Sequence, residues 1–558
     1  MRNGFALCVM ALAASVASCA LSDAPVEANT PATARALSAR SPTTRPAEAP
    51  AESPEPTSAH APGHEPAETL GKARQVAEIN RQLIGLAKAG KFAECKPLIE
   101  KILAIDPHNS VAWYNMACVH SRLGAPAKAV GALNKALAAG YSDFRYMQRD
   151  PDLDAIRKRP DYKRLLARND QVQRDRAEKM RKALQDRFGA DYICQVDHTR
   201  KLVFATNVDR TTLEEVKTVL TAHAEALWKD LFDHRFEQYV TVVVPSADDP
   251  SFRRAGVGGY YAHVQRMLVA RQVGMVLTHE FTHALHDADQ DGLGQRHPIW
   301  IMEGLATLYE SSKIVAGRAV PQPNHRLNML QRYVAAGRTI AFKTLLNYDQ
   351  AKFMKHAQTA YPQVRYIMMY LHAKGRLKKW YDAYTAGYGA DPTGGQAIAQ
   401  VFGKDLGQVE ADWKRWVKAQ TAPPLRLPVR HAYLGVSVRG QTDGLRIARI
   451  VKNSGAHKAG LKPTDVIVGI DGERMVDSGA LIRLVNTKKV GEKVEVRFRR
   501  GGEYKTVTVT LGAMPAHVAG VRPTPRTRPK RRSVPATRPA TSTVPATAPA
   551  TRPAKKAA

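Results

Sequence analysis

The pattern HEFTH, residues 279–283, restricts the fold and chemistry of this chain more than any other feature. His279 and His283 are four residues apart, so on a helix their imidazoles lie one above the other on the same face. Two stacked imidazoles can bind one metal ion, and the adjacent carboxylate of Glu280 can hold a water molecule at that ion. Nineteen residues separate His283 from Glu303, which is well placed to supply a third ligand. The pattern therefore predicts a zinc (Zn²⁺) site with His279, His283 and Glu303 as ligands.

The sequence around the motif supports this prediction. VLTHEFTHALH is typical of one continuous helix, and the phrase WIMEGLATLYE surrounds Glu303. Both phrases resemble the gluzincin branch of metallopeptidases, including the peptidase MA family of bacterial envelope proteins, over residues 191–420. The resemblance implies an α+β zincin-like metallopeptidase domain at residues 189–420, in which Glu280 is the catalytic residue that takes a proton from zinc-bound water. The alternative is a helix that carries two solvated histidines.

Other residues of this region are weaker candidates. Tyr361 and Tyr366 are candidate hydrogen-bond donors to an oxyanion, and both are equally explained as core aromatics. Thr307 either supports a metal ligand or is an ordinary helix residue. Residues 259–271 are predicted to form one strand at the edge of a cleft, where Tyr261 and His263 would affect an extended peptide.

The pattern of apolar residues gives the remaining elements of this region. Strands are predicted at 192–197, 201–206 and 238–245, and an amphipathic helix at 212–232. A charged helix at 170–188 is interpreted as a linker, and residues 342–420 are mostly helical.

The N-terminus has the features of an export signal. One positive residue precedes a short apolar stretch at residues 1–19, which ends in Val16-Ala17-Ser18-Cys19. This ending resembles a bacterial lipobox and implies lipidation of Cys19 and a membrane anchor, whereas ordinary signal cleavage nearby is the alternative. Residues 20–70 are rich in Ala, Pro, Thr and Glu and are predicted to be a disordered tether. The chain is therefore expected in the bacterial cell envelope, either periplasmic or anchored as a lipoprotein.

A helical repeat follows at residues 72–168. Gly90 and Gly124 are 34 residues apart, as are Lys101 and Lys135, and 34 residues is the period of the tetratricopeptide repeat. The second copy, AWYNMACVHSRLGAPAKAVGALNKALAAG, resembles that family, and residues 150–166 resemble its capping segment. The repeats are interpreted either as a binding site for a partner protein or as a structural spacer.

Residues 431–513 form the last predicted domain. Five short strands and two helical stretches alternate there, and SGAHKAGLKPTDVIVGIDGERM resembles a PDZ domain of bacterial envelope proteases. Such domains bind the C-terminus of a peptide by strand addition. The resemblance assigns the loop that holds the peptide carboxylate to Leu434, Gly435 and Val436. The alternative is a PDZ fold that only regulates its neighbour.

Charge and cysteine content add little to the choice of function. The net charge is +32, and ten Lys or Arg with no acidic residue lie at 522–558, in a disordered basic Pro/Thr/Arg/Ala tail at 514–558. This tail either binds an anionic surface or is simply solvated. No nucleic-acid-binding motif is present, so no nucleic-acid partner is expected. Cys95, Cys118 and Cys194 show no metal-site or disulfide spacing.

These patterns together predict a multidomain fold with α-helical repeats, a zincin-like domain, a small β-rich PDZ domain and disordered termini. The predicted function is a zinc metallopeptidase that hydrolyses envelope proteins or peptides, with the flanking modules binding substrates or partners. The alternatives are a non-enzymatic envelope scaffold and a zinc hydrolase of a non-peptide bond.

Overall fold

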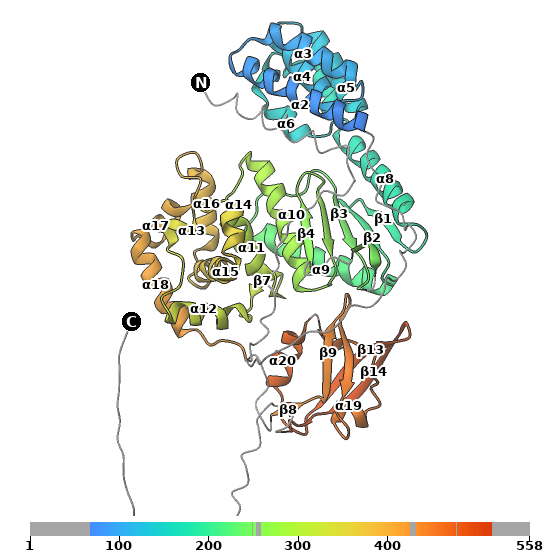
Figure 1. Ribbon diagram of the computed structural model, residues 1–558, viewed down its shortest axis with the longest axis vertical. Helices are drawn as coiled ribbons and strands as arrows, with labels where there is room; N and C mark the ends of the chain where they lie inside the picture. The colour runs from blue at the N-terminus through green and yellow to red at the C-terminus, as the bar shows by residue number, and fades with distance from the viewer. Residues whose placement is uncertain (1–66, 248, 253–257, 425–430, 476, 516–558) are drawn as a thin grey trace, which may run out of the picture.

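The computed structural model describes residues 67–247, 249–252, 258–424, 431–475 and 477–515. The predicted signal peptide, Cys19, most of the spacer and nearly all of the basic tail lie outside the described residues. The described chain forms three parts that follow one another in space (Figure 1): a helical part at the top, an α+β domain in the middle and a small β-rich domain below. In the ranges described, no helix combines the length and the hydropathy that crossing a membrane requires.

The N-terminal part consists of two helix pairs and a closing segment. Gly90 (φ +72°) and Gly124 (φ +71°) end the first helix of each pair in the left-handed conformation that a Cβ atom disfavours. The 34-residue offset in the sequence is therefore a structural repeat. The elements are α2 (Ala67–Lys88), α3 (Phe92–Ile105), α4 (Ser110–Arg122), α5 (Pro126–Ala138), α6 (Phe144–Arg149), η2 (Pro151–Ile156) and α7 (Pro160–Leu166).

The central domain is built on a five-stranded sheet in the order β1-β2-β3-β5-β4. β2, β3 and β5 are parallel, whereas the edge strands β1 and β4 run antiparallel to their neighbours. The strands are β1 (Ile193–Asp197), β2 (Leu202–Thr206), β3 (Val240–Val244), β4 (Gly259–Ala262) and β5 (Met267–Ala270), and a single turn, η3 (Pro250–Phe252), precedes β4.

Both faces of this sheet are covered by helices. α9 (Arg210–Asp230) and α10 (Met275–Leu293) pack on one face, in a core that includes Phe204, Val242 and Phe281. α8 (Asn169–Phe188) packs on the opposite face, where Ala177 and Leu184 contact alternate residues of the same strands. The helix interpreted as a linker is therefore a layer of the central domain. The apolar residues that it buries against the sheet, Ala177, Met180, Leu184 and Phe188, are few, and the high content of charged residues masks them in the sequence.

The segment at 259–271 is a hairpin rather than the single predicted strand. Its polar centre, His263 to Arg266, forms the turn between β4 and β5, and Arg266 adopts a positive φ of 47°. β4 lies at the edge of the sheet, and it packs beside α10.

A helical lobe completes the central domain, on the left of Figure 1. Its core contains three fully buried tryptophans, Trp300, Trp380 and Trp413. A capping box formed by Asp405 and Gln408 begins the last helix. The elements are α11 (Ile299–Tyr309), β6 (Ser312–Val315), β7 (Arg318–Pro321), α12 (Arg326–Ala335), α13 (Phe342–Leu345), α14 (Gln350–Lys355), α15 (Ala357–Ala373), α16 (Leu377–Gly387), α17 (Gly395–Phe402) and α18 (Leu406–Ala419).

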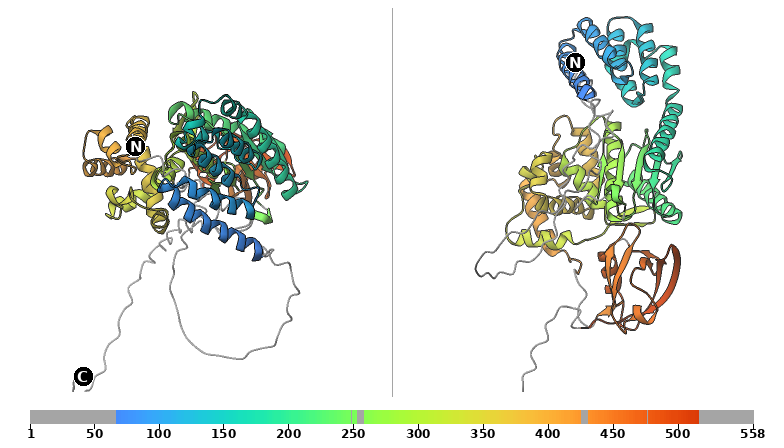
Figure 2. Two further views of the ribbon diagram at one scale, coloured as in Figure 1. Left: turned by 90° about the horizontal axis from the view of Figure 1, so that it is seen from above. Right: turned by 45° about the vertical axis from the view of Figure 1, so that its right-hand side comes forward.

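The C-terminal domain has its main sheet in the order β14-β13-β11-β10-β9, so β9 is an edge strand. Helix α20 packs against β8 and β9 and covers the side of the sheet next to this edge. The right-hand view of Figure 2 shows this domain below the central sheet. Its elements are β8 (Ala432–Tyr433), β9 (Val436–Gly440), β10 (Leu445–Ile450), α19 (Gly455–Lys458), β11 (Val466–Ile470), β12 (Glu473–Arg474), α20 (Ser478–Asn486), β13 (Lys493–Arg500), β14 (Glu503–Thr510) and β15 (Gly512–Ala513).

Candidate metal centre and peptide-binding groove

Helix α10 carries the HEFTH motif and brings its two histidines together. The Nε2 atoms of His279 and His283 are 3.2 Å apart, and the two rings meet edge to face. Both side chains are largely buried, because the opposite face of the helix packs Phe281 and Leu285 into the core. The four-residue spacing alone is sufficient to produce this arrangement.

Helix α11 brings Glu303 to the same point. Its Oε2 atom lies 3.4 Å from His279 Nε2 and 3.7 Å from His283 Nε2. The three potential ligand atoms lie within 4.8 Å of one another. Glu303 Oε2 is buried and accepts no hydrogen bond within the part of the chain that the structure describes. A buried carboxylate oxygen without a donor normally requires compensation, and a cation between these three residues would provide it.

Glu280 lies beside this cluster and is also buried. Its pKa is raised to about 7, mainly by burial and also by the nearby Glu303 carboxylate, while His279 acts in the opposite direction. Gly259 on β4 leaves room for this side chain, because a Cβ at that position would lie 3.1 Å from Glu280 Cγ and 2.6 Å from Val276 Cγ1. The edge strand and the motif helix therefore require a glycine at their closest approach.

Sequence reasoning missed Glu310, which supports His279 from behind. Glu310 Oε2 lies 3.2 Å from His279 Nδ1, and its other oxygen accepts hydrogen bonds from Arg326 Nε (2.8 Å) and Asn324 Nδ2 (2.9 Å). Burial raises the pKa of this carboxyl, but Arg326 and His279 outweigh burial and hold the pKa well below its usual range. A carboxylate behind a histidine fixes the ring and its tautomer. Glu310 ends the quoted phrase WIMEGLATLYE, but its role depends on Arg326 and Asn324, which lie beyond it.

The structure places the weaker candidates, Thr307, Tyr366 and Tyr361, in different surroundings. Thr307 Oγ1 bonds to the carbonyls of Glu303 (2.6 Å) and Gly304 (3.1 Å), so it acts as an ordinary helix residue. Tyr366 is buried in the core and its hydroxyl faces the Asn324 amide. Burial raises the pKa of the Tyr361 hydroxyl, and the nearby Glu303 carboxylate raises it further.

The β4–β5 hairpin places two further side chains near the cluster. Tyr261 Oη donates to Asp287 Oδ2 (2.9 Å), and His263 Nδ1 lies 3.2 Å from Asp287 Oδ1. The His263 ring is 6.4 Å from the His283 ring, centroid to centroid. Because Asp287 is one helical turn after His283, the motif helix itself orients both hairpin side chains.

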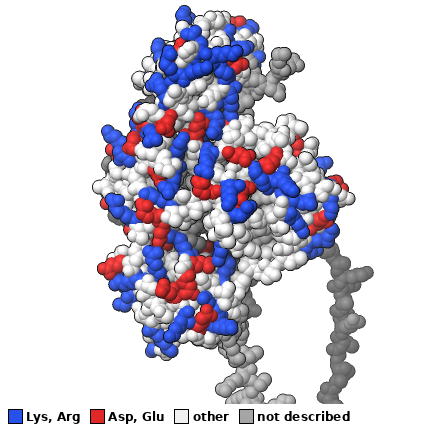
Figure 3. Space-filling view, turned by 180° about the vertical axis from the view of Figure 1, so that it is seen from behind, with Lys and Arg blue, Asp and Glu red and all other residues white. Residues whose placement is uncertain are grey.

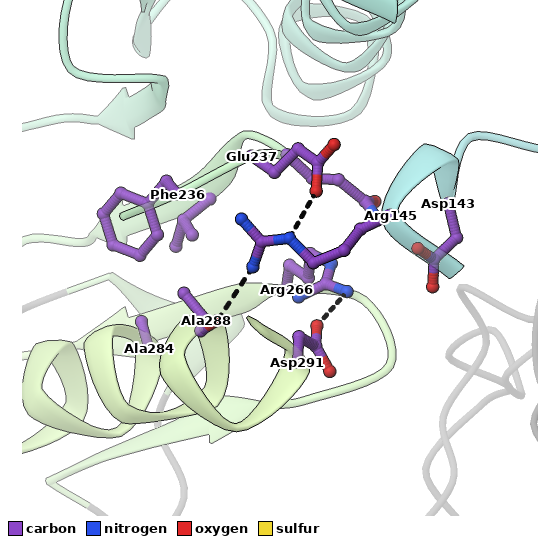
Figure 4. Close-up of a pocket in the computed structure, with 10 residues that line it drawn as sticks. Asp143, Arg145, Phe236, Glu237, Arg266, Ala284, Ala288 and Asp291 are labelled. Atoms are coloured by element: carbon purple, nitrogen blue, oxygen red, sulfur yellow. Dashed lines mark hydrogen bonds and ion pairs between the residues drawn. The ribbon is translucent and has the colours of Figure 1, made fainter. Parts of the chain in front are cut away.

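The flanking domains contact the two ends of the motif helix. At its C-terminal end, Arg149 of α6 donates to the carbonyls of Asp291 (2.6 Å) and Gly292 (3.3 Å). Arg145 donates to Ala288 O (3.4 Å) and pairs with Glu237 (2.8 Å) beside a cavity of about 20 Å³ (Figure 4). The last carbonyls of a helix have no partners within the helix and carry partial negative charge, so cations are favourable there.

At the other end, the turn between β9 and β10 reaches the start of α10. The Val273 amide donates to the Thr442 carbonyl at 2.6 Å, immediately before the helix begins. Thr442 Oγ1 also donates to Pro245 O at 3.3 Å, at the end of β3. The motif helix is thus in contact with both neighbouring domains.

The loop before β9 contains Leu434 and Gly435, which together with Val436, the first residue of β9, are the residues predicted to hold a peptide carboxylate. Gly435 has a φ of +96°, and a Cβ there would lie 2.1 Å from Ser454 Cβ. The carbonyls of Leu434 and Gly435 accept bonds from the amides of Ala456 (2.9 Å) and Val451 (2.8 Å). Over the described residues, the amides of Leu434 and Gly435 donate to no acceptor. These two N–H groups are therefore free to bind an anion beside the open edge of β9.

Comparison with known proteins identifies the two flanking domains. The family described as "PDZ domain" matches residues 432–511, and the family described as "Tetratricopeptide repeat" matches residues 86–149. The chain therefore contains tetratricopeptide repeats and a PDZ domain, as predicted from the sequence, in a multidomain arrangement. Neither match reaches the central domain, so a zincin-like fold is not shown by them.

Curated relatives match over short stretches. The chain is 36% identical over 108 residues to a chloroplast protein of Arabidopsis thaliana, covering 18% of this chain and 32% of that protein. It is 34% identical over 99 residues to a "Probable periplasmic serine endoprotease DegP-like" of Marinomonas sp., covering 16% of this chain and 21% of the relative. A protein of the same name from Hahella chejuensis is 38% identical over 82 residues, covering 15% and 18%. The chain thus spans less than a third of the length of these relatives.

Solved structures match over similarly short stretches. "HtrA-type protease AlgW with tripeptide" is 26% identical with a TM-score of 0.15, covering 15% of this chain and 32% of that one. The PDZ domain of HtrA3, bound to a phage-derived ligand, is 21% identical with a TM-score of 0.14, covering 15% of this chain and 90% of that one.

These findings correct the predicted enzyme class. The proteases that this chain resembles are serine endoproteases, which contradicts the prediction of a zinc metallopeptidase of the gluzincin type. The physical reason is that HEFTH and a distant glutamate specify where ligands meet but not which reaction follows. The serine endoprotease activity is that of the named relatives, which this chain matches only over short stretches.

Proposed function

We propose that this chain is an exported cell-envelope protein whose PDZ domain binds the C-terminal segment of another protein beside a metal-holding central domain. The observation that carries the proposal is the pair of free amides at Leu434 and Gly435, next to the open edge of β9. A peptide added to this edge would place its terminal carboxylate at those two N–H groups. The DegP-like relatives are periplasmic by name, which agrees with an exported protein.

The groove beside β9 indicates the kind of terminus. Val436 and Val438 are partly buried on the groove side of β9, and Leu481 and Leu484 of α20 are each 8% exposed. An apolar final side chain would be buried between the strand and the helix, and its carboxylate would remain at the loop. The expected ligand therefore has a free C-terminus and an apolar last residue.

The central domain would hold zinc through His279, His283 and Glu303. Two imidazole nitrogens and one carboxylate oxygen suit zinc better than the all-oxygen ligand sets of calcium or magnesium. The unpaired Glu303 Oε2 and the short distance between the two Nε2 atoms support the assignment. When bound, the ion would supply a localised positive charge beside Glu280. The zincin-like fold of this domain also remains a proposal, supported by the edge strand β4 lying alongside the motif helix.

Two finer assignments complete the proposal. The tetratricopeptide repeats would bind a partner protein, although their contacts with α10 also make them structural.

Lipidation at Cys19 would anchor the chain, and a Cys19→Ser variant that stayed with the membrane would argue against it.

The test of peptide binding uses the full chain and a fluorescent ten-residue peptide that ends in valine. Fluorescence polarisation is measured with the free carboxylate and with the same peptide amidated. Binding only of the free acid is expected. Equal binding of both forms, or of neither, would contradict the proposal.

The test of the metal is zinc stoichiometry by mass spectrometry after dialysis. One zinc per chain is expected for the wild type, and much less for His283→Ala. His198→Ala is the matched control, because His198 is a half-exposed histidine in the same domain, bonded to Tyr239. Retention of zinc by His283→Ala would refute the site.

A further inference from the structure

The open edge of the peptide groove carries unpaired positive charge. Arg439 lies on β9, and Arg446 lies directly opposite it on β10. Both side chains are exposed, and among the described residues neither guanidinium meets a carboxylate. Like charges placed opposite each other on neighbouring strands destabilise a sheet. An anionic ligand would remove this cost.

The acidic residues of the same domain are already engaged elsewhere. Asp443 pairs with Arg499 at 2.7 Å, Asp465 with Arg500 at 2.7 Å, and Asp471 with Lys488 at 2.7 Å. Glu473 pairs with Lys313 of the central domain at 3.2 Å. These four carboxylates are thus paired with cations other than Arg439 and Arg446. Arg449 on β10 and Lys452 just after it are also exposed. The space-filling view in Figure 3 shows both acidic and basic residues on this domain on the face seen from behind.

Strand geometry fixes which ligand residues would meet these arginines. Successive side chains of a strand point to opposite faces. Val436 and Val438 face the groove, so Ser437 and Arg439 face the other side. A peptide that runs antiparallel to β9, with its carboxylate at Gly435, has its last side chain in the groove. Its side chain three positions earlier then lies on the outer face, beside Arg439.

We propose that the ligands of this PDZ domain carry an acidic residue three positions before an apolar C-terminal residue, recognised by Arg439 and Arg446. The inference rests on the proposed peptide binding and adds the chemistry of the ligand. A peptide is favoured over an anionic membrane, because Arg439 lies on the edge strand β9, which a peptide would pair with, and Arg446 lies opposite it on β10.

The experiment measures polarisation of the full chain with three ten-residue peptides. All three end in valine and differ only in having Glu, Gln or Lys three positions before it. The Lys peptide is expected to bind about five- to tenfold more weakly than the Glu peptide, with Gln between them, and the difference should shrink in high salt.

Two variants complete the design. Arg439→Glu should remove or reverse the preference, so that the Lys peptide binds as well as or better than the Glu peptide. Lys493→Glu is the matched control, because Lys493 is also exposed on a strand of this domain but lies on β13, away from the groove. This control should keep the wild-type preference.

The outcomes separate the two proposals. Equal binding of all three peptides would overturn the acidic preference and leave C-terminal peptide binding intact. Binding of none would overturn both. If Lys493→Glu also lost the preference, the effect would come from the overall charge of the domain. Competition between the peptide and vesicles of anionic phospholipid would have the same meaning. Either result would overturn recognition by Arg439 and Arg446.

Discussion

Replacing Glu310 by glutamine tests whether the buried carboxylate behind His279 supports a metal site. In the wild type, Glu310 accepts from His279, Arg326 and Asn324, and the guanidinium of the fully buried Arg365 is 3.9 Å away. Glu310→Gln keeps the size of the side chain but removes its charge. Two arginines then lose their buried counter-ion.

Two separate losses are expected. Breaking a buried ion pair by removing one partner costs about 3–5 kcal/mol, and part exposure of Arg326 places the value near the lower end, at about 3 kcal/mol. Losing the partner of a metal-bound histidine lowers metal affinity about 10- to 100-fold, which is about 1.4–2.8 kcal/mol. The first loss is independent of zinc, whereas the second is seen only when zinc is bound.

Urea unfolding with zinc and with chelator separates the two losses. The variant should be destabilised in chelator, and by a further amount of about 1.4–2.8 kcal/mol in saturating zinc at equal free concentration. Glu225→Gln is the control, because Glu225 pairs with Arg235 at 2.8 Å on the surface, and should change neither value by more than about 1 kcal/mol. Equal destabilisation in zinc and in chelator would refute a supporting role of Glu310 at the metal.

Three further predictions concern the motif helix and its surroundings. Arg149→Met should lower the free energy of unfolding by about 1–2 kcal/mol, because two carbonyls at the end of α10 lose a cationic donor. Calorimetry would test this, with Arg168→Met as the control, because the side chain of Arg168 bonds to the exposed Asn134 side chain. Gly259→Ala should cost about 1–3 kcal/mol, because the new methyl group would lie 2.6 Å from Val276; thermal unfolding at the wild-type temperature would contradict the close approach. Burial lowers the pKa of the His223 imidazole to about 4, below its unfolded value of about 6.5. The contribution of the neutral His223 ring to the free energy of unfolding is therefore complete above pH 6.5. About 3 kcal/mol of it is lost as the pH falls towards 4. The free energy of unfolding of His223→Gln should fall less steeply over this range.

Local patterns in the sequence predicted the parts of the site that depend on short spacings. The four-residue spacing of His279 and His283 fixes their shared face because a helix repeats every 3.6 residues. The 34-residue offset between Gly90 and Gly124 predicted the helix pairs, and the structure shows both glycines in the left-handed conformation that other residues disfavour. The order of strands and helices, together with the phrase SGAHKAGLKPTDVIVGIDGERM, resembles a PDZ domain, which the comparisons identify.

Other inferences from the sequence were wrong because residue identity alone does not determine the backbone conformation, the packing or the reaction. The apolar run at 259–271 was predicted as one strand because its turn has neither glycine nor proline, and Arg266 instead adopts the positive φ. The helix at 170–188 was interpreted as a linker because its charged residues hide a narrow buried face. The peptidase assignment failed because a ligand pattern constrains geometry and leaves the reaction open.

The sequence by itself determined that His279 and His283 share one face, because that depends only on the repeat of a single helix. Only the tertiary structure decided what surrounds them. Glu310 reaches His279 across 31 residues of sequence, and Arg149 reaches the end of α10 across 142. The opposition of Arg439 and Arg446 depends on strand register. Such contacts arise from the packing of whole elements, which no local spacing encodes.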